Sequence, residues 1–173
     1  MLVSLGMHGT IGIESAEVFD VIILDLPDPS NFAVSKLYSR EFYASLVQRL
    51  AGHGAIVTQA GSPLFAREAF WSIAETFSVT GNPLVPGEGL EILPYHAHVP
   101  SFGNWGFVIA HAGPLRTKSA PFPPDLKFIN ASHWDAMKRF PNDTAAVPVD
   151  ANSVITHALV TYYRDGWERW FGQ

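Results

Sequence analysis

The sequence predicts an α/β fold with a mixed sheet, and three observations carry that prediction. Patterns of buried strands alternate with amphipathic helix patterns up to residue 81, which is typical of parallel strands joined by helical crossovers. Two more strand patterns then follow each other across a short turn, which predicts a late antiparallel hairpin. After Gly113 the chain becomes rich in proline and polar residues and closes on a helix pattern, so we expect a C-terminal helical extension.

Two parallel strands are expected first. One covers Asp20–Asp25, where four consecutive branched apolar residues stand between two acids. Such a run is typical of a strand that is buried on both faces. The segment 26–31, with two prolines and two Asp or Asn residues, predicts a turn. The second strand is expected over Gly54–Gln59.

Two helices are expected in the same region. The first begins at Ser39, a candidate N-cap, and ends at Gly52 and Gly54. Its apolar face repeats every four residues, at Phe42, Leu46 and Leu50. The second begins at Ser62–Pro63, a cap followed by a proline, and ends at Gly81. Its apolar stripe is Phe65, Ala69, Ile73 and Phe77.

The hairpin is expected to pair a strand over residues 90–99, interrupted by Pro94, with a strand over Trp105–Ala110. In the extension, a short helix is expected near Ser132–Asp135, a pattern close to a capping box. The last helix is expected over residues 153–171. Its apolar residues near one face are Ile155, Leu159, Tyr162 and Trp170.

The composition argues against several classes of protein. The chain has 173 residues, 47% hydrophobic and 16% charged, which is typical of one globular domain. A net charge of −5 without a basic cluster argues against nucleic-acid binding. The lack of cysteine removes disulfides, thiolate zinc sites and a thiol nucleophile. No apolar run is long enough to be a membrane segment and no signal-peptide pattern is found, so we expect a cytoplasmic protein.

Polar side chains follow the ends of three expected strands, which is where open α/β sheets bind their ligands. Asp25 ends the first strand and Asp28 follows it, while Gln59 ends the second strand. The turn of the hairpin carries a third group, Ser101, Phe102, Asn104 and Trp105. We expect these three ends to border one crevice.

The two acids, three residues apart in a proline-stiffened turn, form an anionic patch that suits an amine. An alkylammonium has a pKa of about 10.4 and must lose its proton before it can attack an electrophile. One acid can accept that proton while the other anchors the substrate. Aromatic neighbours would add a cation–π attraction of about 0.5–2 kcal/mol. Acids at this place can equally cap the turn or the next helix, so the spacing alone leaves both interpretations open.

Other candidate residues are expected to be structural. His96 and His98 would share one face of a strand, but no third ligand accompanies them, so we expect no metal site. The aromatic residues of the last helix are expected to be packing residues, namely Tyr162, Tyr163, Trp167 and Trp170.

Four segments carry a more specific pattern, in a fixed order along the chain. Asp20–Pro29 (DVIILDLPDP) contains a strand followed by DxxDP, and Leu37–Tyr43 (LYSREFY) begins a helix. Gly54–Gln59 is the next strand, and Val99–Phe107 opens P-[ST]-[YF] and closes G-F. Together they resemble the polyamine aminopropyltransferases, the spermidine synthase family. The segment DLPDPSN and the C-terminal segment Tyr162–Trp167 look most like the corresponding segments of bacterial members that are fused to membrane segments.

The resemblance implies a methyltransferase-like Rossmann fold and an aminopropyl transfer. The donor would be decarboxylated S-adenosylmethionine, a co-substrate and not a tightly bound cofactor, and the acceptor a small-molecule diamine such as putrescine. The products would be spermidine and methylthioadenosine. No metal is needed, because the sulfonium is already a good leaving group. Carried over by motif, Asp25 is the catalytic proton acceptor. The substrate-binding residues are Asp28, Gln59, Phe102, Ser101 and Trp105.

The resemblance also implies a division of the chain. Residues 19–112 would be the C-terminal half of the Rossmann-like catalytic domain, and residues 113–173 an extension packed on the same domain. Residues 1–18 match the family poorly, and no GGGDG-like loop is found in the sequence, so the residues that bind the co-substrate stay unknown. Asn31–Ala33 stands where the family continues G-P-A, and Phe102 where many members have tyrosine.

We therefore expect a truncated or split member, whose partner could be a second copy or a complementary N-terminal half. We expect the chain to descend from a transferase, but we do not expect the isolated chain to catalyse the reaction. Two alternatives stay open. One is a methyltransferase-like nucleoside-binding domain, although such a domain has no general need of two acids here. The other is a non-catalytic scaffold, with an exposed sheet edge at residues 20–25 as its pairing site.

Overall fold

The computed structural model describes residues 2–5, 18–113 and 121–172 of the chain. Within these residues, one mixed sheet has five strands in the order β1-β2-β3-β5-β4. They are β1 (Leu2–Leu5), β2 (Phe19–Leu24), β3 (Leu50–Gly61), β4 (Glu91–Val99) and β5 (Gly103–His111). The first three are parallel, whereas β5 is antiparallel to both of its neighbours. The predicted mixed sheet with a late hairpin is confirmed.

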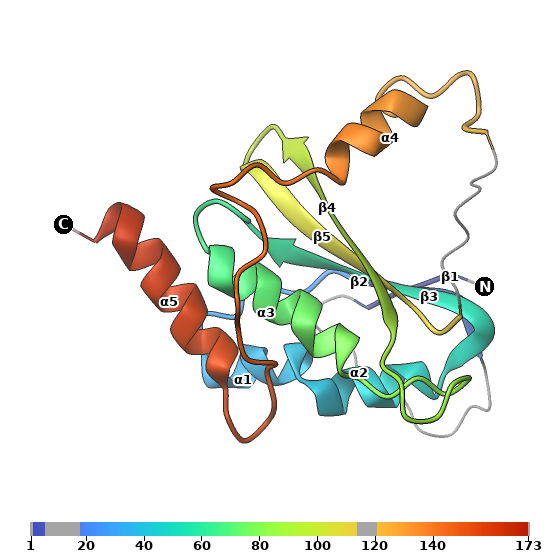
Figure 1. The fold of residues 1–173 in the computed structure, drawn as a ribbon, viewed down its shortest axis with the longest axis horizontal. Coiled ribbons are helices and arrows are strands. Elements are labelled where there is room, and N and C mark those ends of the chain that lie inside the picture. Colours follow the sequence, from blue (N-terminus) through green and yellow to red (C-terminus); the bar gives the residue numbers. More distant parts are fainter. Residues whose placement is uncertain (1, 6–17, 114–120, 173) are drawn as a thin grey trace.

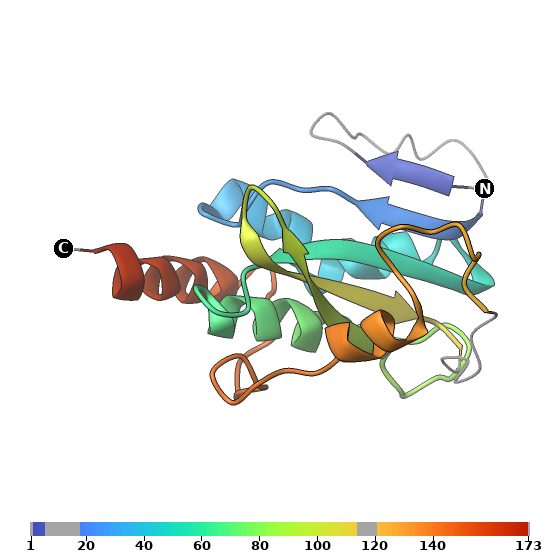
Figure 2. The same ribbon diagram turned by 90° about the horizontal axis from the view of Figure 1, so that it is seen from above.

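The helices are distributed unequally over the two faces of the sheet. They are α1 (Phe32–Ser35), followed by a 3-10 turn at Lys36–Tyr38, then α2 (Arg40–Val47), α3 (Arg67–Ser78), α4 (Ala131–Met137) and α5 (Ala158–Phe171). Figure 1 and Figure 2 show α1, α2, α3 and α5 on one side of the sheet, whereas α4 lies beside β4 on the other side.

The core lies between the sheet and helices α2 and α3. Its strand residues include Ile22, Leu24, Ile56 and Val108, all buried. The rings of Tyr43 and Phe77 stack there, with centroids 3.7 Å apart. The alternate residues of β2, Val21 and Ile23, are only half-buried. The predicted burial of this strand on both faces is therefore wrong, because the described helices of the core cover one face.

Helix α2 begins as predicted and ends earlier. The Ser39 hydroxyl accepts a hydrogen bond of 3.2 Å from the Phe42 amide, which is the N-cap expected from the sequence. The helix ends at Val47, and Leu50 already belongs to β3. Gly54 does not end the helix. It allows β3 to approach β2 closely, because a Cβ atom there would lie 2.9 Å from the carbonyl oxygen of Phe19.

Helix α3 begins at Arg67, later than predicted. The Ser62 hydroxyl accepts hydrogen bonds from the amides of Leu64 and Phe65, so it caps a separate turn that precedes the helix. Phe65 therefore lies outside the helix, while the other members of the predicted stripe are buried as expected, namely Ala69, Ile73 and Phe77.

The hairpin strand β4 runs through Pro94 without interruption, and Pro94 is opposite Val108. The predicted break is wrong because β4 is an edge of the described sheet, where a missing amide hydrogen is tolerated. The short helix α4 is capped by Asn130, whose side chain accepts from the His133 amide at 2.9 Å, and not by Ser132.

Helix α5 packs against α3 and contributes to the core through Leu159. Its predicted apolar stripe is wrong at two positions, because Ile155 is 83% exposed and precedes the helix, and Trp170 is 51% exposed. Gly166 is buried on the inner face instead. A Cβ atom there would lie 2.8 Å from the Cα of Ala66, so a glycine is required where α5 touches the turn before α3. The division of the chain at residues 112 and 113 stays a prediction.

The sheet edge expected at residues 20–25 is covered, because β1 pairs in parallel with β2 from Val21 to Leu24. The scaffold interpretation thus loses the edge on which it depended. Of the segment 1–18, residues 1 and 6–17 lie outside the described part. No helix in the described ranges is both long and apolar enough to cross a membrane.

Candidate active site

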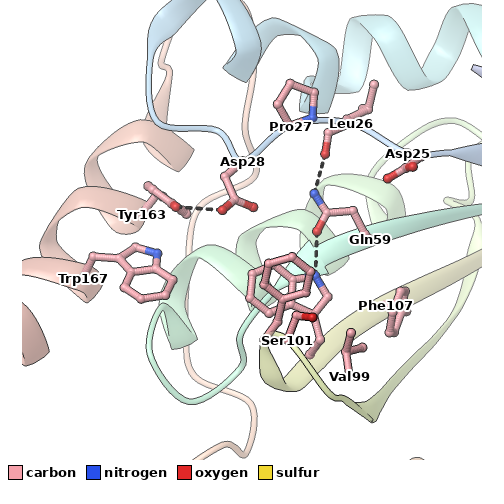
Figure 3. Close-up of a pocket in the computed structure, with 12 residues that line it drawn as sticks. Asp25, Leu26, Pro27, Asp28, Gln59, Val99, Ser101, Phe107, Tyr163 and Trp167 are labelled. Carbon is pink, nitrogen blue, oxygen red and sulfur yellow. Dashed lines mark hydrogen bonds between the residues drawn. The ribbon is translucent and has the colours of Figure 1, made fainter. Parts of the chain in front are cut away.

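A pocket of about 710 Å³ lies where β2 and β3 end, between the turn of the hairpin and helix α5 (Figure 3). Its volume is in the range of small-molecule sites. All six residues predicted for the site line it. The full lining is Asp25, Leu26, Pro27, Asp28, Gln59, Val99, Ser101, Phe102, Trp105, Phe107, Tyr163 and Trp167.

The two acids occupy different environments within this pocket. Asp25 follows β2 directly and is exposed, and it accepts no hydrogen bond from any other residue that the structure describes. Asp28 is half-buried, and its Oδ2 accepts a hydrogen bond of 2.9 Å from the Tyr163 hydroxyl. In the view of Figure 3, the Gln59 side chain lies between the two carboxylates. The carboxylate of Asp25 is therefore open to a ligand in the pocket, whereas that of Asp28 is held by Tyr163.

Gln59 connects three of the elements that form the pocket, namely β3, the turn after β2 and the hairpin. Its Oε1 accepts a hydrogen bond of 2.8 Å from the Trp105 indole nitrogen. Its amide nitrogen donates to the Leu26 carbonyl oxygen and, at 3.1 Å, to the Tyr38 hydroxyl. Both amide hydrogens are thus used within the protein. The contact that the resemblance implies between Gln59 and the substrate stays a prediction, and the structure gives this side chain a positioning role.

Tyr38 supports the turn that carries the two acids by hydrogen bonds to the backbone of that turn. Its hydroxyl lies 3.0 Å from the Pro27 carbonyl oxygen, to which it donates. Burial, and then the charge of Asp28, raises the pKa of Tyr38 far above its ordinary value. The hydroxyl therefore stays protonated and continues to donate over the whole physiological pH range.

Aromatic rings form much of the remaining wall. Phe102 is 58% exposed, and its ring centroid lies 5.1 Å from that of Trp105. Ser101 is exposed at the tip of the same turn, and Phe107 lines the pocket from β5. The backbone of Gly103, with φ of +74°, completes this turn in a conformation that favours glycine. Acids surrounded by aromatic faces are suited to an organic cation.

Two lining residues, Tyr163 and Trp167, were expected to be packing residues of the last helix. Tyr163 is half-buried and donates to Asp28, and burial, followed by the charge of Asp28, raises its pKa well above the ordinary value. The indole N–H of Trp167 is buried near this phenol without a hydrogen bond of normal geometry to any described residue. The sequence does carry a signal for a role of these two residues in the pocket. Each ring has a polar O–H or N–H group, and the two residues are four positions apart, so they share one face of the helix.

The described residues hold no cluster of three or more side chains that could bind a metal ion. His96 lies with its Nε2 2.8 Å from the carbonyl oxygen of Arg139, and His98 is exposed on the same strand.

Comparisons with known proteins identify the family. The spermine/spermidine synthase domain matches residues 7–118, so the chain belongs to this family. A polyamine aminopropyltransferase of Leptospira interrogans is 42% identical over 156 residues, and one of Oceanobacillus iheyensis is 36% identical over 161 residues. These matches cover 90% and 91% of this chain but 30% of each relative. The chain thus spans less than a third of the length of these relatives.

Two solved structures have the same fold. A spermidine synthase in complex with the transition-state analogue AdoDATO has a TM-score of 0.52 and 22% identity, covering 73% of this chain and 41% of that chain. Spermidine synthase from Thermotoga maritima has a TM-score of 0.54 and 24% identity, covering 73% and 42%. The family membership and the partial methyltransferase-like Rossmann fold predicted from the sequence are confirmed.

Proposed function

We propose that this chain provides the amine-binding side of an aminopropyltransferase site. The donor is decarboxylated S-adenosylmethionine, the acceptor is a diamine such as putrescine, and the products are spermidine and methylthioadenosine. The observation that carries the proposal is the pocket itself, in which Asp25 and Asp28 share one cavity with aromatic walls. None of its lining residues is basic, so the pocket favours a positively charged ligand.

The proposed reaction begins with loss of a proton from the attacking ammonium group. Asp25 accepts this proton, because its carboxylate is exposed to the pocket and carries no hydrogen bond from another described residue. The free lone pair forms a bond to the methylene carbon beside the sulfonium. The carbon–sulfur bond breaks, and its electron pair stays on sulfur in the departing methylthioadenosine. Charge and atoms balance, since the ammonium proton ends on Asp25, which becomes neutral, and the positive charge of the sulfonium ends on the alkylated nitrogen of the product, a secondary ammonium.

The second acid anchors the substrate in this proposal. Asp28 is held by Tyr163 and therefore keeps one carboxylate oxygen directed by the protein. The adenosyl part of the donor is assigned to no residue of this chain. A second copy of the chain, or a complementary half like the remainder of the Leptospira relative, is the partner that we propose for that part.

The test measures methylthioadenosine formed from putrescine and decarboxylated S-adenosylmethionine. The chain is assayed alone and mixed with the remaining part of the Leptospira relative. We expect Asp25→Asn to lower the rate about 100-fold or more, which is the usual contribution of a general base. The matched control is Asp143→Asn, an exposed acid that does not line the pocket, and it should keep the wild-type rate. Absence of product in both arms, or equal rates for the two variants, would overturn the proposal.

A further inference from the structure

We propose that Tyr163 and Trp167 of α5 form, with Asp28, the subsite for the distal ammonium group of the acceptor, and so make the site selective for diamines over monoamines. This inference rests on the proposed function and adds a substrate-selecting role for the C-terminal helix. Both aromatic residues lie in the C-terminal segment Tyr162–Trp167, to which the sequence assigns a resemblance but no role in the site.

The first support is the way Asp28 is held. The Tyr163 hydroxyl donates to Oδ2 across a separation of 135 residues in the chain. No described residue donates to the other oxygen, Oδ1. The bond from Tyr163 restricts the rotation of the carboxylate, and Oδ1 is left to accept from a ligand. A charge-assisted hydrogen bond from an ammonium group is the strong interaction that suits such an oxygen.

The second support is the aromatic surface that Tyr163 and Trp167 add to the wall of the same pocket as Asp28. The rings of Tyr163 and Trp167 have centroids 6.0 Å apart and are inclined by 52° to each other, so they form two walls of a corner. Figure 3 shows the nitrogen side of the Trp167 indole directed toward Tyr163 and Asp28. Tryptophan is the aromatic residue that binds cations best, and an acid combined with two ring faces is a recurrent site for ammonium groups.

The third support is that α5 is fixed in place by its own contacts. The close approach at Gly166 seats the helix on Ala66, and the ring of Phe65 lies 5.4 Å from that of Trp167. At its N-terminal end, the Leu159 amide donates to Asn152, whose side chain in turn donates to the Ser35 carbonyl oxygen at 2.8 Å. The helix is therefore anchored at two places, and the corner that it presents to the pocket is preformed.

The two acids are then assigned to the two ends of one substrate. The attacking nitrogen lies at Asp25, and the distal nitrogen lies at Asp28 and the corner formed by α5. A monoamine can occupy the first position and leaves the second without its cation. The structure thus predicts a preference that depends on residues of α5, not on the acid that accepts the proton.

The test compares the affinities of 1,4-diaminobutane and n-butylamine for the full chain by calorimetric titration. The variants are Tyr163→Phe and Trp167→Phe. Each should lower the ratio of diamine to monoamine affinity about tenfold, by loss of the oriented carboxylate or of the stronger ring contact. The matched control is Tyr162→Phe, because the Tyr162 hydroxyl bonds Asp150 away from the pocket. It should leave the ratio unchanged. Thermal unfolding of each variant shows whether the helix stays folded.

The outcomes separate this inference from the proposed function. A ratio that falls in the two pocket variants and not in Tyr162→Phe supports the subsite, even if no methylthioadenosine is formed and the proposed function fails. An unchanged ratio in both pocket variants, or an equal fall in the control, overturns the subsite while transfer activity can persist. A wild-type chain that binds both amines equally, or neither, also overturns it.

Discussion

The Trp105 indole nitrogen donates a hydrogen bond of 2.8 Å to Oε1 of Gln59, and this bond ties the hairpin to the end of β3. The same glutamine holds the Leu26 carbonyl oxygen with its amide nitrogen. One side chain therefore fixes the distance between the aromatic wall and the turn that carries the acids. The shape of the pocket depends on this connection as much as on the residues that would touch a ligand.

We expect Gln59→Leu to lower the free energy of unfolding by about 1–3 kcal/mol, because it leaves the Trp105 N–H without its partner and the Leu26 carbonyl with only the longer hydrogen bond from the Tyr38 hydroxyl, at 3.3 Å. Trp105→Phe removes the same bond from the other side. The double variant should therefore lose less than the sum of the two single losses. Urea unfolding measures all three, and Gln48→Leu, at an exposed glutamine after α2, should change stability by less than about 0.5 kcal/mol. Strict additivity of the two pocket variants would contradict the connection.

A second prediction concerns the close contact between Gly166 of α5 and the turn before α3. Gly166→Ala should destabilise the protein by about 1–3 kcal/mol, because its Cβ atom would collide with the backbone of Ala66 and Phe65. It should also weaken diamine binding, since the displaced helix carries Tyr163 and Trp167. Gly52→Ala is the control, because a Cβ atom there meets nothing within 4 Å. Equal unfolding midpoints for the two variants would show that the close approach does not constrain the helix.

The pH dependence of stability provides a third prediction. The pKa of Tyr163 is raised above its ordinary value of 10.0 by burial and by Asp28, so the folded state favours the neutral phenol. Its stabilising contribution is fully present below pH 10.0 and is lost as the pH rises further, because the unfolded chain then ionises first. The free energy of unfolding should fall as pH increases above 10, and less steeply in Tyr163→Phe. Denaturant unfolding at pH 9 to 11 tests this. Identical slopes for the two proteins would contradict it.

The sequence located one side of the pocket and missed the other for a physical reason. Asp25, Asp28 and Gln59 could be placed because each follows a buried strand, and neighbouring parallel strands end at the same edge. Tyr163 could not, because its contact with Asp28 joins segments 135 residues apart and depends on how α5 crosses α3. A helix pattern shows which residues share a face. It does not show which neighbouring element that face meets.

Glycine positions show the same limit in the fold. The sequence predicts a helix end at Gly54, because glycine often ends helices. The structure uses it for a close approach of two strands, which no local pattern distinguishes from a helix end. The sequence likewise predicts a break at Pro94, although an edge strand accepts proline. Local propensities predict which helices and strands form, whereas tertiary contacts determine the residues at which they begin and end.

The central claim is that both acids of the pocket meet one diamine, and carboxyl ¹³C NMR tests it most directly. Titration with 1,4-diaminobutane should shift the side-chain carboxyl signals of Asp25 and Asp28 together, with a single apparent dissociation constant. The signal of Asp143, outside the pocket, should stay in place. A titration that moves neither pocket acid, or that moves Asp143 as much as Asp25 and Asp28, would contradict the account.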